Sequence, residues 1–345
     1  MKAPNLLLLI QKKNLPKKYK LNIVLIIVGI IILVIGGELL VRGAVTIAQR
    51  FHISTLVVGM TVVAFGTSAP ELLVSLEAMF EGHPGIAIGN VVGSNIANIA
   101  LVLGVTAVIF PILVSRNSYR VDWPFMMLAT FMVYGFMWLN FDPEMGGEYV
   151  SSINRMNGII MVSLLVGFSC FLIWKSRKVT KAIHKEAKQE PKIPKSSVTK
   201  DVLFVVIGSV GLAGGAHLLV EGTVGLATVL GISDYVISVT VVAFGTSLPE
   251  LMTSVMAAFK RHSDLSVGNL LGSNVFNILG ILGITAIFKE IPISELVLNI
   301  DMLWVMGISL VVFPMMITRK KISKVEGFIL LALYCSYLYF TVVRS

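Results

Sequence analysis

The sequence predicts an all-α polytopic membrane protein, in which ten transmembrane helices form two inverted five-helix repeats with broken helices at the membrane midplane. Three observations lead to this prediction. Hydrophobic residues make up 56% of the 345 residues and the mean hydropathy is +0.87, which is far above the range of soluble proteins. A ten-residue stretch occurs twice, 179 residues apart. The loops that flank its two copies carry opposite charges.

Apolar stretches long enough to span a membrane occur five times before a charged linker and five times after it. We expect a basic N-terminal arm over residues 1–20, a first repeat over 21–174, a cytoplasmic linker over 175–200 and a second repeat over 201–345. The expected spans cover roughly 21–46, 55–80, 86–113, 122–140, 155–174, 201–228, 235–259, 265–288, 299–317 and 324–343.

The repeat is visible residue by residue. The stretch from Val62 to Glu71 returns almost unchanged from Val241 to Glu250. From Thr61 to Ala107, aligned without a gap on the segment 179 residues later, 26 of 47 positions are identical. Because each copy contains an odd number of spans, the second copy must enter the membrane from the opposite side.

Loop charges test this inversion independently. The turn over residues 81–84 has no Lys or Arg, whereas its counterpart over 260–262 has two. An acidic loop corresponds in the same way to a basic one (Asp142, Glu144 and Glu148 against Arg319, Lys320 and Lys321). The positive-inside rule then places the linker in the cytoplasm and both termini outside. The lysine-rich arm argues for the reverse, and we give more weight to the many short loops.

The net charge of +9 does not indicate a nucleic-acid partner, because most of it lies in the arm and the linker, where basic residues report membrane orientation. The two cysteines, Cys170 and Cys335, lie in apolar runs and form no metal-binding or disulfide pattern. We expect an integral membrane protein with the lipid bilayer as its surroundings and no cofactor.

The duplicated stretch combines residues that are unusual inside a membrane. A helix that reaches Gly66 cannot run smoothly through Pro70, because proline lacks the N–H and clashes with the preceding turn. We therefore expect a break between Gly66 and Pro70, and another at the equivalent Pro249. A break frees backbone carbonyls beside hydroxyl groups and a glutamate, which are hard oxygen ligands for Na⁺ or Ca²⁺. An ionisable residue at membrane depth indicates function by default.

A second motif follows each glutamate. Gly89-Asn90-Val91-Val92-Gly93-Ser94-Asn95 precedes Asn98, and its counterpart from Gly268 to Asn274 precedes Asn277. Ser94 and Asn98 are four residues apart and share a helix face, as do Ser273 and Asn277. Small and amide residues can also simply hold membrane helices together. The occurrence of both copies after a proline and a glutamate favours a role at a site.

Structural alternatives exist for the other polar residues. Thr67, Ser68, Thr246 and Ser247 could cap a half-helix that begins at the proline, and capping is compatible with ion binding. A buried ion pair is disfavoured for Glu71 and Glu250, since the central spans contain no Lys or Arg. In the first and sixth spans, end-of-helix pairs four residues apart are more plausible than a proton relay (Glu38 with Arg42, and His217 with Glu221).

With both motifs in hand, the chain resembles the calcium/cation antiporter superfamily, in particular its sodium/calcium exchanger branch. The likeness is carried by Gly66-Thr67-Ser68-Ala69-Pro70-Glu71 with Gly93-Ser94-Asn95, and by Gly245-Thr246-Ser247-Leu248-Pro249-Glu250 with Gly272-Ser273-Asn274. Proton-coupled members of the superfamily typically have an Asn-Ala-x-Glu motif where this chain has Thr-Ser-x-Pro-Glu. That difference favours sodium coupling. The resemblance to prokaryotic-type exchangers implies a prokaryotic inner membrane as the location.

The resemblance implies an ion site at the midplane and a role for each matching residue. It implies that Ca²⁺ binds between Glu71 and Glu250, helped by Thr67 and Thr246. The Na⁺ sites would draw on the carbonyl groups of Ala64 and Ala243 and on four hydroxyl groups (Ser68, Ser94, Ser247 and Ser273), and Asn98 and Asn277 would line the centre. Some members have Asp in place of Asn277, and the potassium-dependent branch relies on that acid. The Asn therefore argues against potassium co-transport.

The predicted function is an antiporter that exchanges Na⁺ for Ca²⁺ by alternating access. A Ca²⁺/H⁺ antiporter on the same scaffold is the nearest alternative, and a passive cation channel is a more distant one. An intramembrane hydrolase is disfavoured, because catalysis needs one asymmetric nucleophile–base pair and here both copies keep the same residues. We therefore expect no enzymatic activity.

Overall fold

The computed structural model describes residues 17–144, 149–187, 196–229 and 243–344, and it is helical almost throughout. Most of the predicted arm, the middle of the linker and residues 235–242 of the expected span 235–259 lie outside these residues. The helices of the first half of the chain are α2 (Lys17–Arg50), α3 (Thr55–Val58), α4 (Ala64–Phe80), α5 (Pro84–Ile96), α6 (Leu103–Ile109), α7 (Trp123–Leu139) and α8 (Arg155–Ala187). Those of the second half are α9 (Val198–Val229), α11 (Ala243–Gly245), α12 (Leu248–Phe259), α13 (Ser263–Val275), α14 (Leu282–Phe288), α15 (Met302–Ile317) and α16 (Lys324–Arg344).

Short π-helical segments join several of these helices into longer ones. They cover Gly59–Val63, Ala97–Val102, Ser118–Asp122, Phe276–Ile281 and Val297–Asp301. In the described residues, seven helices are long and apolar enough to cross a membrane: Lys20–Arg50, Thr55–Phe80, Pro84–Ile109, Arg155–Lys181, Val198–Thr228, Ser263–Phe288 and Val297–Lys320. α7, α12 and α16 occupy the places of the other three expected spans. The prediction of an all-helical membrane protein is confirmed.

The expected break in the first copy is wrong. α4 runs from Ala64 to Phe80 with Pro70 inside it, and the helix before it continues through a π-helical segment. A proline inside a helix removes the donor to the carbonyl four residues earlier, here Gly66, and crowds that carbonyl, and membrane helices tolerate both effects where protein groups surround the site. The second copy does break. A turn at Thr246 and Ser247 separates α11 from α12, which has Pro249 in its first turn.

The helix α8 continues to Ala187 and α9 begins at Val198, so both helices extend into the residue range of the predicted charged linker. The residues on either side of this linker lie at one end of the molecule, which we call the linker end. Arg50 at the end of α2 pairs with Asp201 there, and the backbone N–H of Ser54 donates to the Ser176 hydroxyl at 2.7 Å. The opposite end, which we call the far end, holds the turn after α4, where Lys289 donates to the Met79 carbonyl at 2.8 Å.

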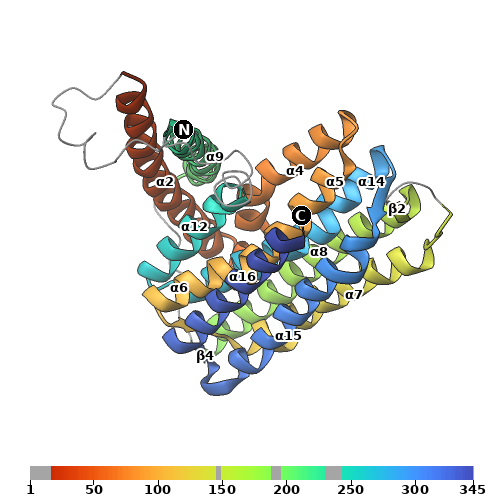
Figure 1. The fold of residues 1–345 in the computed structure, drawn as a ribbon. Helices are drawn as coiled ribbons and strands as arrows, with labels where there is room; N and C mark the ends of the chain where they lie inside the picture. Colours follow the sequence, from red (N-terminus) through yellow and green to blue (C-terminus); the bar gives the residue numbers. More distant parts are fainter. Residues whose placement is uncertain (1–16, 145–148, 188–195, 230–242, 345) are drawn as a thin grey trace.

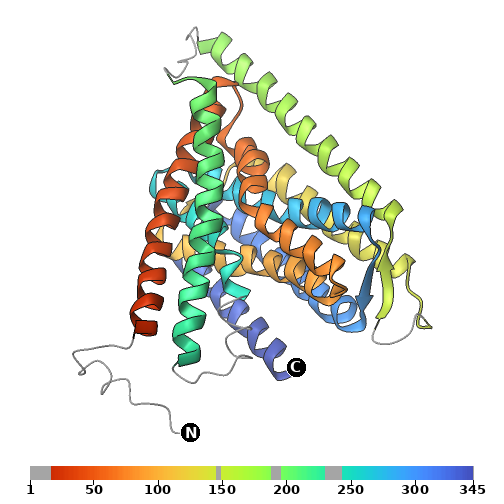
Figure 2. The ribbon, with the colours of Figure 1, turned by 90° about the horizontal axis from the view of Figure 1, so that it is seen from above.

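α2 and α9 form an antiparallel pair at one edge of the molecule (Figures 1 and 2). Glycines recur every seven residues on both helices and allow backbone contact. A Cβ built at Gly29 would lie 2.8 Å from the Gly215 carbonyl oxygen, and one built at Gly36 would lie 3.0 Å from that of Gly208. The two helices are therefore packed too closely to separate easily.

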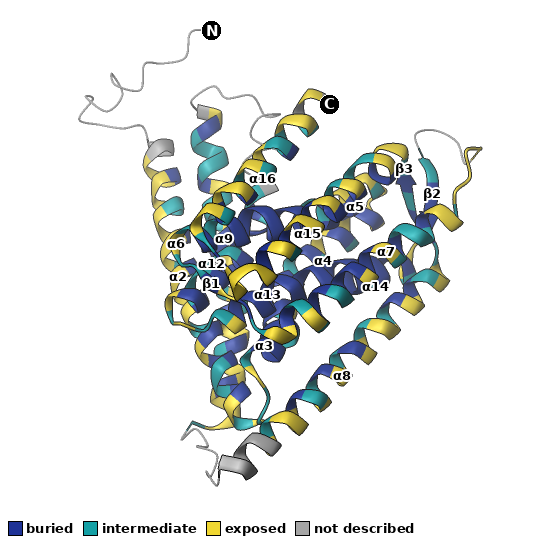
Figure 3. Cartoon of the chain, turned by 90° about the horizontal axis from the view of Figure 1, so that it is seen from below, coloured by how far each residue is buried: buried dark blue, intermediate teal, exposed yellow. Residues whose placement is uncertain are grey.

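Burial divides the helices into an inner and an outer set (Figure 3). The apolar windows of Pro84–Ile109 and Ser263–Phe288 are 78% and 83% buried, whereas those of α2, α8 and α9 are at most 28% buried. Two small antiparallel sheets tie the halves of the chain together. β1 (Ile112–Leu113) pairs with β4 (Lys321–Ile322), and β2 (Tyr149–Ile153) pairs with β3 (Ile291–Ser294). The two most buried of these helices carry the second sequence motif, and the glutamates of the first motif, on α4 and α12, are themselves buried.

Candidate ion-binding site

Two glutamates lie in the interior, one from each copy of the motif. Glu71 is in α4 and Glu250 is in the first turn of α12, and they are 1% and 0% exposed. The two helices that carry these carboxylates pack against each other. Within the described residues neither takes part in an ion pair, and no group of three or more His, Cys, Asp or Glu side chains could hold a metal. Glu71 and Glu250 are therefore buried acids without a basic partner among the described residues.

Hydroxyl groups of the first copy reach residues of the second copy. The Ser68 hydroxyl donates to Glu250 Oε1 at 3.0 Å, across 182 residues of sequence. Thr67 Oγ1 lies 3.4 Å from Ser273 Oγ and donates to the carbonyl of Ala64 at 3.3 Å. The structure thus brings five of the sequence-predicted residues together, around the Glu250 side of the site.

The matching residues of the other copy are arranged differently. Both carboxylate oxygens of Glu71 and the hydroxyl of Ser247 are buried without a hydrogen-bond partner in the described part of the chain. Ser247 occupies the N-cap position of α12, yet its side chain makes no capping bond. Thr246 is partly exposed in the turn, and Ala243 begins α11. The capping interpretation of the hydroxyl groups is therefore not realised at Ser247.

The two asparagines lie in equivalent π-helical segments. Asn98 and Asn277 are 1% and 0% exposed, and both polar atoms of each amide lack a partner among the described residues. The segment of Asn98 packs against α12, which carries Glu250, and the segment of Asn277 packs against α4, which carries Glu71. Ser94, also buried, donates to the carbonyl of Asn90 at 2.6 Å.

Sequence reasoning missed two further asparagines as members of the site. Asn90 Nδ2 donates to the backbone carbonyl of Glu71 at 3.1 Å and to the Ser75 hydroxyl at 3.0 Å. Its counterpart Asn269 donates to the Glu250 carbonyl at 3.5 Å and to Ser254 at 3.1 Å. Identity at the interval of 179 residues was the available signal, since Ser75 and Ser254 also match. The Oδ1 atom of Asn269 also lies 3.3 Å from Thr67 Oγ1, as an alternative acceptor for that hydroxyl, so Asn269 links the two copies.

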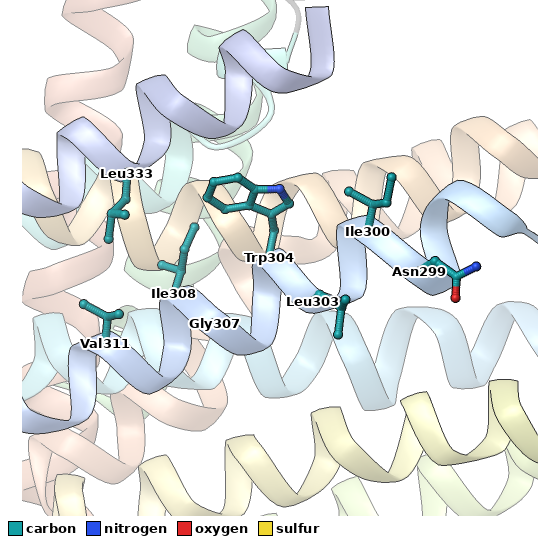
Figure 4. A pocket seen from close by; sticks show the side chains of 8 residues that line it. All are labelled: Asn299, Ile300, Leu303, Trp304, Gly307, Ile308, Val311 and Leu333. Carbon is teal, nitrogen blue, oxygen red and sulfur yellow. The ribbon is translucent and has the colours of Figure 1, made fainter. Parts of the chain in front are cut away.

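This arrangement suits a cation with oxygen ligands. A buried polar atom without a partner costs free energy, and each such atom in a folded protein needs an explanation. Here carboxylate, amide and hydroxyl oxygens without partners belong to inner helices that pack against one another. Hard cations such as Na⁺ and Ca²⁺ prefer this kind of ligand. A pocket of about 380 Å³ on the surface of α15 and α16 is apolar and contains none of these residues (Figure 4).

Comparisons with known proteins agree with the chemistry of the site. The family model described as sodium/calcium exchanger protein matches residues 21–174 and 200–343. The chain is 29% identical to the sodium/calcium exchanger MaX1 of Methanosarcina acetivorans, covering 92% of this chain and 97% of that one. It is 30% identical to the inner membrane protein YrbG of Escherichia coli, covering 86% and 89%.

A solved structure of the sodium-calcium exchanger NCX_Mj superposes on this chain with a TM-score of 0.77 at 32% identity, over 93% of this chain and 99% of that one. The fold is therefore like that of NCX_Mj, and the protein is an integral membrane transporter rather than an enzyme. Because the family model matches both halves of the chain, and with them both glutamate motifs, this protein belongs to the sodium/calcium exchanger protein family.

Proposed function

We propose that the protein is a secondary antiporter that exchanges Na⁺ for Ca²⁺ across the membrane. The observation that carries the proposal is the pair of buried glutamates, one from each copy of the motif. The protein interior around them contains oxygen atoms without hydrogen-bond partners among the described residues. Two carboxylates balance the charge of one Ca²⁺. Once emptied, they would repel each other in a poorly screened interior. The unloaded site should therefore not reorient until Na⁺ or protons replace Ca²⁺, which makes exchange obligatory.

Each predicted ligand has a place in this proposal. Glu71 and Glu250 bind Ca²⁺, with Thr67 and Thr246 beside them. Na⁺ ions use the carbonyl groups of Ala64 and Ala243 and the hydroxyl groups of Ser68, Ser94, Ser247 and Ser273, and Asn98 and Asn277 line the centre. Asn90 and Asn269 hold the backbone of the two glutamates through their carbonyl groups.

We also propose that the two five-span copies are related by an inverted pseudo-two-fold axis. The contact between Gly29 and Gly215 becomes the contact between Gly36 and Gly208 when each residue is replaced by its repeat counterpart. The strands β1 and β3 also correspond, since Ile112 matches Ile291, and each of them pairs with a strand from the other half of the chain. These contacts support an arrangement in which both copies use the same packing in opposite directions.

Alternating access is supported by a difference in burial between residues that correspond to each other in the two copies. Gly89, toward the far end of α5, is exposed, whereas its counterpart Gly268, toward the linker end of α13, is buried. Asn90 is half-buried, whereas Asn269 is buried and bonded to Thr67. Nearly identical sequences thus adopt different surroundings. We infer that this conformation is closed at the linker end and open toward the far end, and that the opposite conformation exchanges these surroundings.

The direct test is calcium uptake by purified protein in liposomes. An outward Na⁺ gradient should drive ⁴⁵Ca²⁺ uptake, and a K⁺ gradient of the same size should not. Uptake that follows a pH gradient without Na⁺ would instead support the Ca²⁺/H⁺ antiporter. Calcium flux without any counter-ion would indicate a channel and would overturn the proposal.

The serine hydroxyls provide a sharper test of the Na⁺ ligands. Changing Ser68 or Ser247 to alanine should raise the Na⁺ concentration for half-maximal exchange severalfold and leave that for Ca²⁺ nearly unchanged. The reason is that each serine contributes a neutral oxygen, which matters more to a monovalent ion than to Ca²⁺ held by two carboxylates. Measuring both concentrations in the same vesicles checks the prediction, and equal shifts for the two ions would contradict it.

The proposed location is a prokaryotic inner membrane with the linker in the cytoplasm. A cysteine at His83, exposed at the far end, should react with a membrane-impermeant thiol reagent in intact cells. A cysteine at Lys181, exposed at the linker end of α8, should react only after the cells are lysed. Cys170 and Cys335 are exposed and must first be replaced by serine. Labelling of the Lys181→Cys protein in intact cells would reverse the orientation.

A further inference from the structure

An ion pair joins the α2/α9 pair to the rest of the bundle at the linker end. Lys260 Nζ, in the residue that caps the C-terminus of α12, donates to Glu38 Oε1 of α2 at 2.9 Å. The sequence had suggested Arg42 as the partner of Glu38, four residues along the same helix. In the structure the Arg42 guanidinium instead lies over the ring of Phe204 on α9, 5.4 Å from its centre. Glu38 therefore contacts a helix that carries the ion site.

The repeat interval assigns both members of this pair a counterpart. Glu38 corresponds to His217 of α9, and Lys260 corresponds to Glu81, the residue that caps the C-terminus of α4 at the far end. The charges are reversed in the counterpart pair: a histidine stands at the position of the acid Glu38, and the acid Glu81 stands at the position of Lys260. The counterpart pair is therefore also attractive when the histidine is protonated. In this structure His217 is paired only loosely with Glu221, at 4.0 Å, and their side chains are 79% and 60% exposed.

We propose that these two pairs are alternating latches. The Glu38–Lys260 pair stabilises the conformation that is closed at the linker end. A His217–Glu81 pair stabilises the opposite conformation, in which the far end is closed. Because α2 and α9 are packed backbone to backbone, they shift together, and closing one latch opens the other. This inference rests on the alternating access proposed above and adds a means of regulation, since only the far-end latch depends on pH.

Histidine is the side chain whose charge normally changes between about pH 5 and 8. Acidification should therefore strengthen the far-end latch and leave the Glu38–Lys260 pair unchanged. Other charged groups lie on α9 and on the elements packed against it, and they also contribute to the electrostatic surroundings of His217. They are Lys20, Glu38, Arg42 and Arg50 of α2, Glu71 and Glu77 of α4 with Glu81 at its C-cap, Lys200, Asp201 and Glu221 of α9, and Glu250 of α12 with Lys260 at its C-cap. Among the described residues, Glu221 is the group recorded in an ion pair with His217.

Ile86→Cys is a suitable reporter of the open far end. Ile86 of α5 is 56% exposed, whereas its repeat counterpart Leu265 is fully buried in a cluster with Leu40 and Val41 of α2, so position 86 should be covered when the far end closes. Cysteine is smaller than isoleucine, so the substitution does not itself crowd the closed conformation. The reporter is placed in a protein that has serine at positions 170 and 335, and the liposomes contain neither Na⁺ nor Ca²⁺. The rate of its reaction with an impermeant thiol reagent measures how often the far end is open. Because thiol reactivity itself depends on pH, each variant is compared with the unaltered reporter protein at the same pH.

Glu38→Gln and Lys260→Gln should each slow labelling by about 1.5- to 5-fold at pH 8, the range expected for an exposed ion pair. The double exchange Glu38→Lys with Lys260→Glu should restore the original rate. Arg261→Gln is the matched control, because it removes a positive charge from the same turn outside the pair, and it should have no effect. The proposal is wrong if the Glu38→Gln protein labels as fast as the original or if the double exchange restores nothing.

The far-end latch is tested by pH. When the pH is lowered from 8 to 6, the labelling rate of the reporter protein should fall relative to that of the same protein carrying His217→Gln, again by about 1.5- to 5-fold. Glu81→Gln should match His217→Gln, and Glu77→Gln, which changes an exposed acid one turn away on α4, should behave like the original. Equal rates for the reporter protein and His217→Gln at pH 6 would overturn the latch. Labelling needs no transport, so the latch proposal and the exchange proposal can fail separately. The labelling test can fail while ⁴⁵Ca²⁺ exchange succeeds, or succeed while exchange fails.

Discussion

Replacing either Glu71 or Glu250 with glutamine should remove nearly all calcium exchange from a protein that still inserts and folds. Glutamine keeps the volume of the side chain and most of its hydrogen bonding but removes one negative charge. A unit charge at ~4 Å contributes roughly 4 kcal/mol at an effective dielectric constant near 20, before desolvation is counted. Even a third of that corresponds to about a tenfold loss of calcium affinity.

The two losses should be similar in size, although the two glutamates differ in this conformation. Glu250 accepts from Ser68, whereas Glu71 has no partner among the described residues. A transport cycle that passes through both conformations exchanges these surroundings. Each glutamate then occupies each of the two surroundings once per cycle, and both glutamates are needed. Sodium-driven ⁴⁵Ca²⁺ uptake, with protein yield and melting temperature as controls, measures the effect. Near-normal exchange by the Glu71→Gln protein beside an inactive Glu250→Gln protein would end the shared-site model.

Gly268→Ala should destabilise the protein, whereas Gly89→Ala should leave its melting temperature unchanged. A Cβ at Gly268 would overlap the carbonyl oxygen of Leu56, and one at Gly272 would lie 2.5 Å from the Cα of Met60. α13 would have to move away from α3 and the π-helical segment that follows it. Such overpacking typically costs about 1–3 kcal/mol, which corresponds to a drop of several degrees in Tm.

Gly89 is the matched control, because it holds the equivalent position and its Cβ direction is open. The transport rates separate two explanations of this difference. If the asymmetry alternates, Gly89 becomes crowded when the far end closes, and Gly89→Ala should slow exchange at least severalfold without lowering Tm. If the asymmetry is permanent, Gly89→Ala should exchange at the original rate. Equal losses of thermal stability in the two variants would contradict the packing described above.

The sequence by itself determined the class of protein and the residues of greatest interest. Membrane insertion follows from apolar composition, which needs no tertiary information. The duplicated motif singled out Glu71 and Glu250, because two carboxylates in apolar segments at one repeat interval have few structural explanations. The site residues themselves remain a proposal, and their convergence on inner helices supports it.

The tertiary structure decided what the repeat could not. Two nearly identical copies have the same local preferences, so sequence alone predicts the same break and the same contacts in each. The structure shows α4 continuous through Pro70 and a turn before Pro249, because the surroundings of the two copies differ. In the proposed conformation, which is closed at one end, equivalent residues have different neighbours. That inequality depends on packing between helices rather than on any local propensity.

The partners of the charged and amide side chains were decided at the same level. Glu38 pairs with Lys260, 222 residues away, instead of with Arg42 one turn along its own helix. Asn269 receives Thr67 from the opposite copy, whereas no such contact of Asn90 with Thr246 is recorded among the described residues. Contacts over such separations arise only when the inner helices assemble, and so the sequence could name these residues without telling which of them meet.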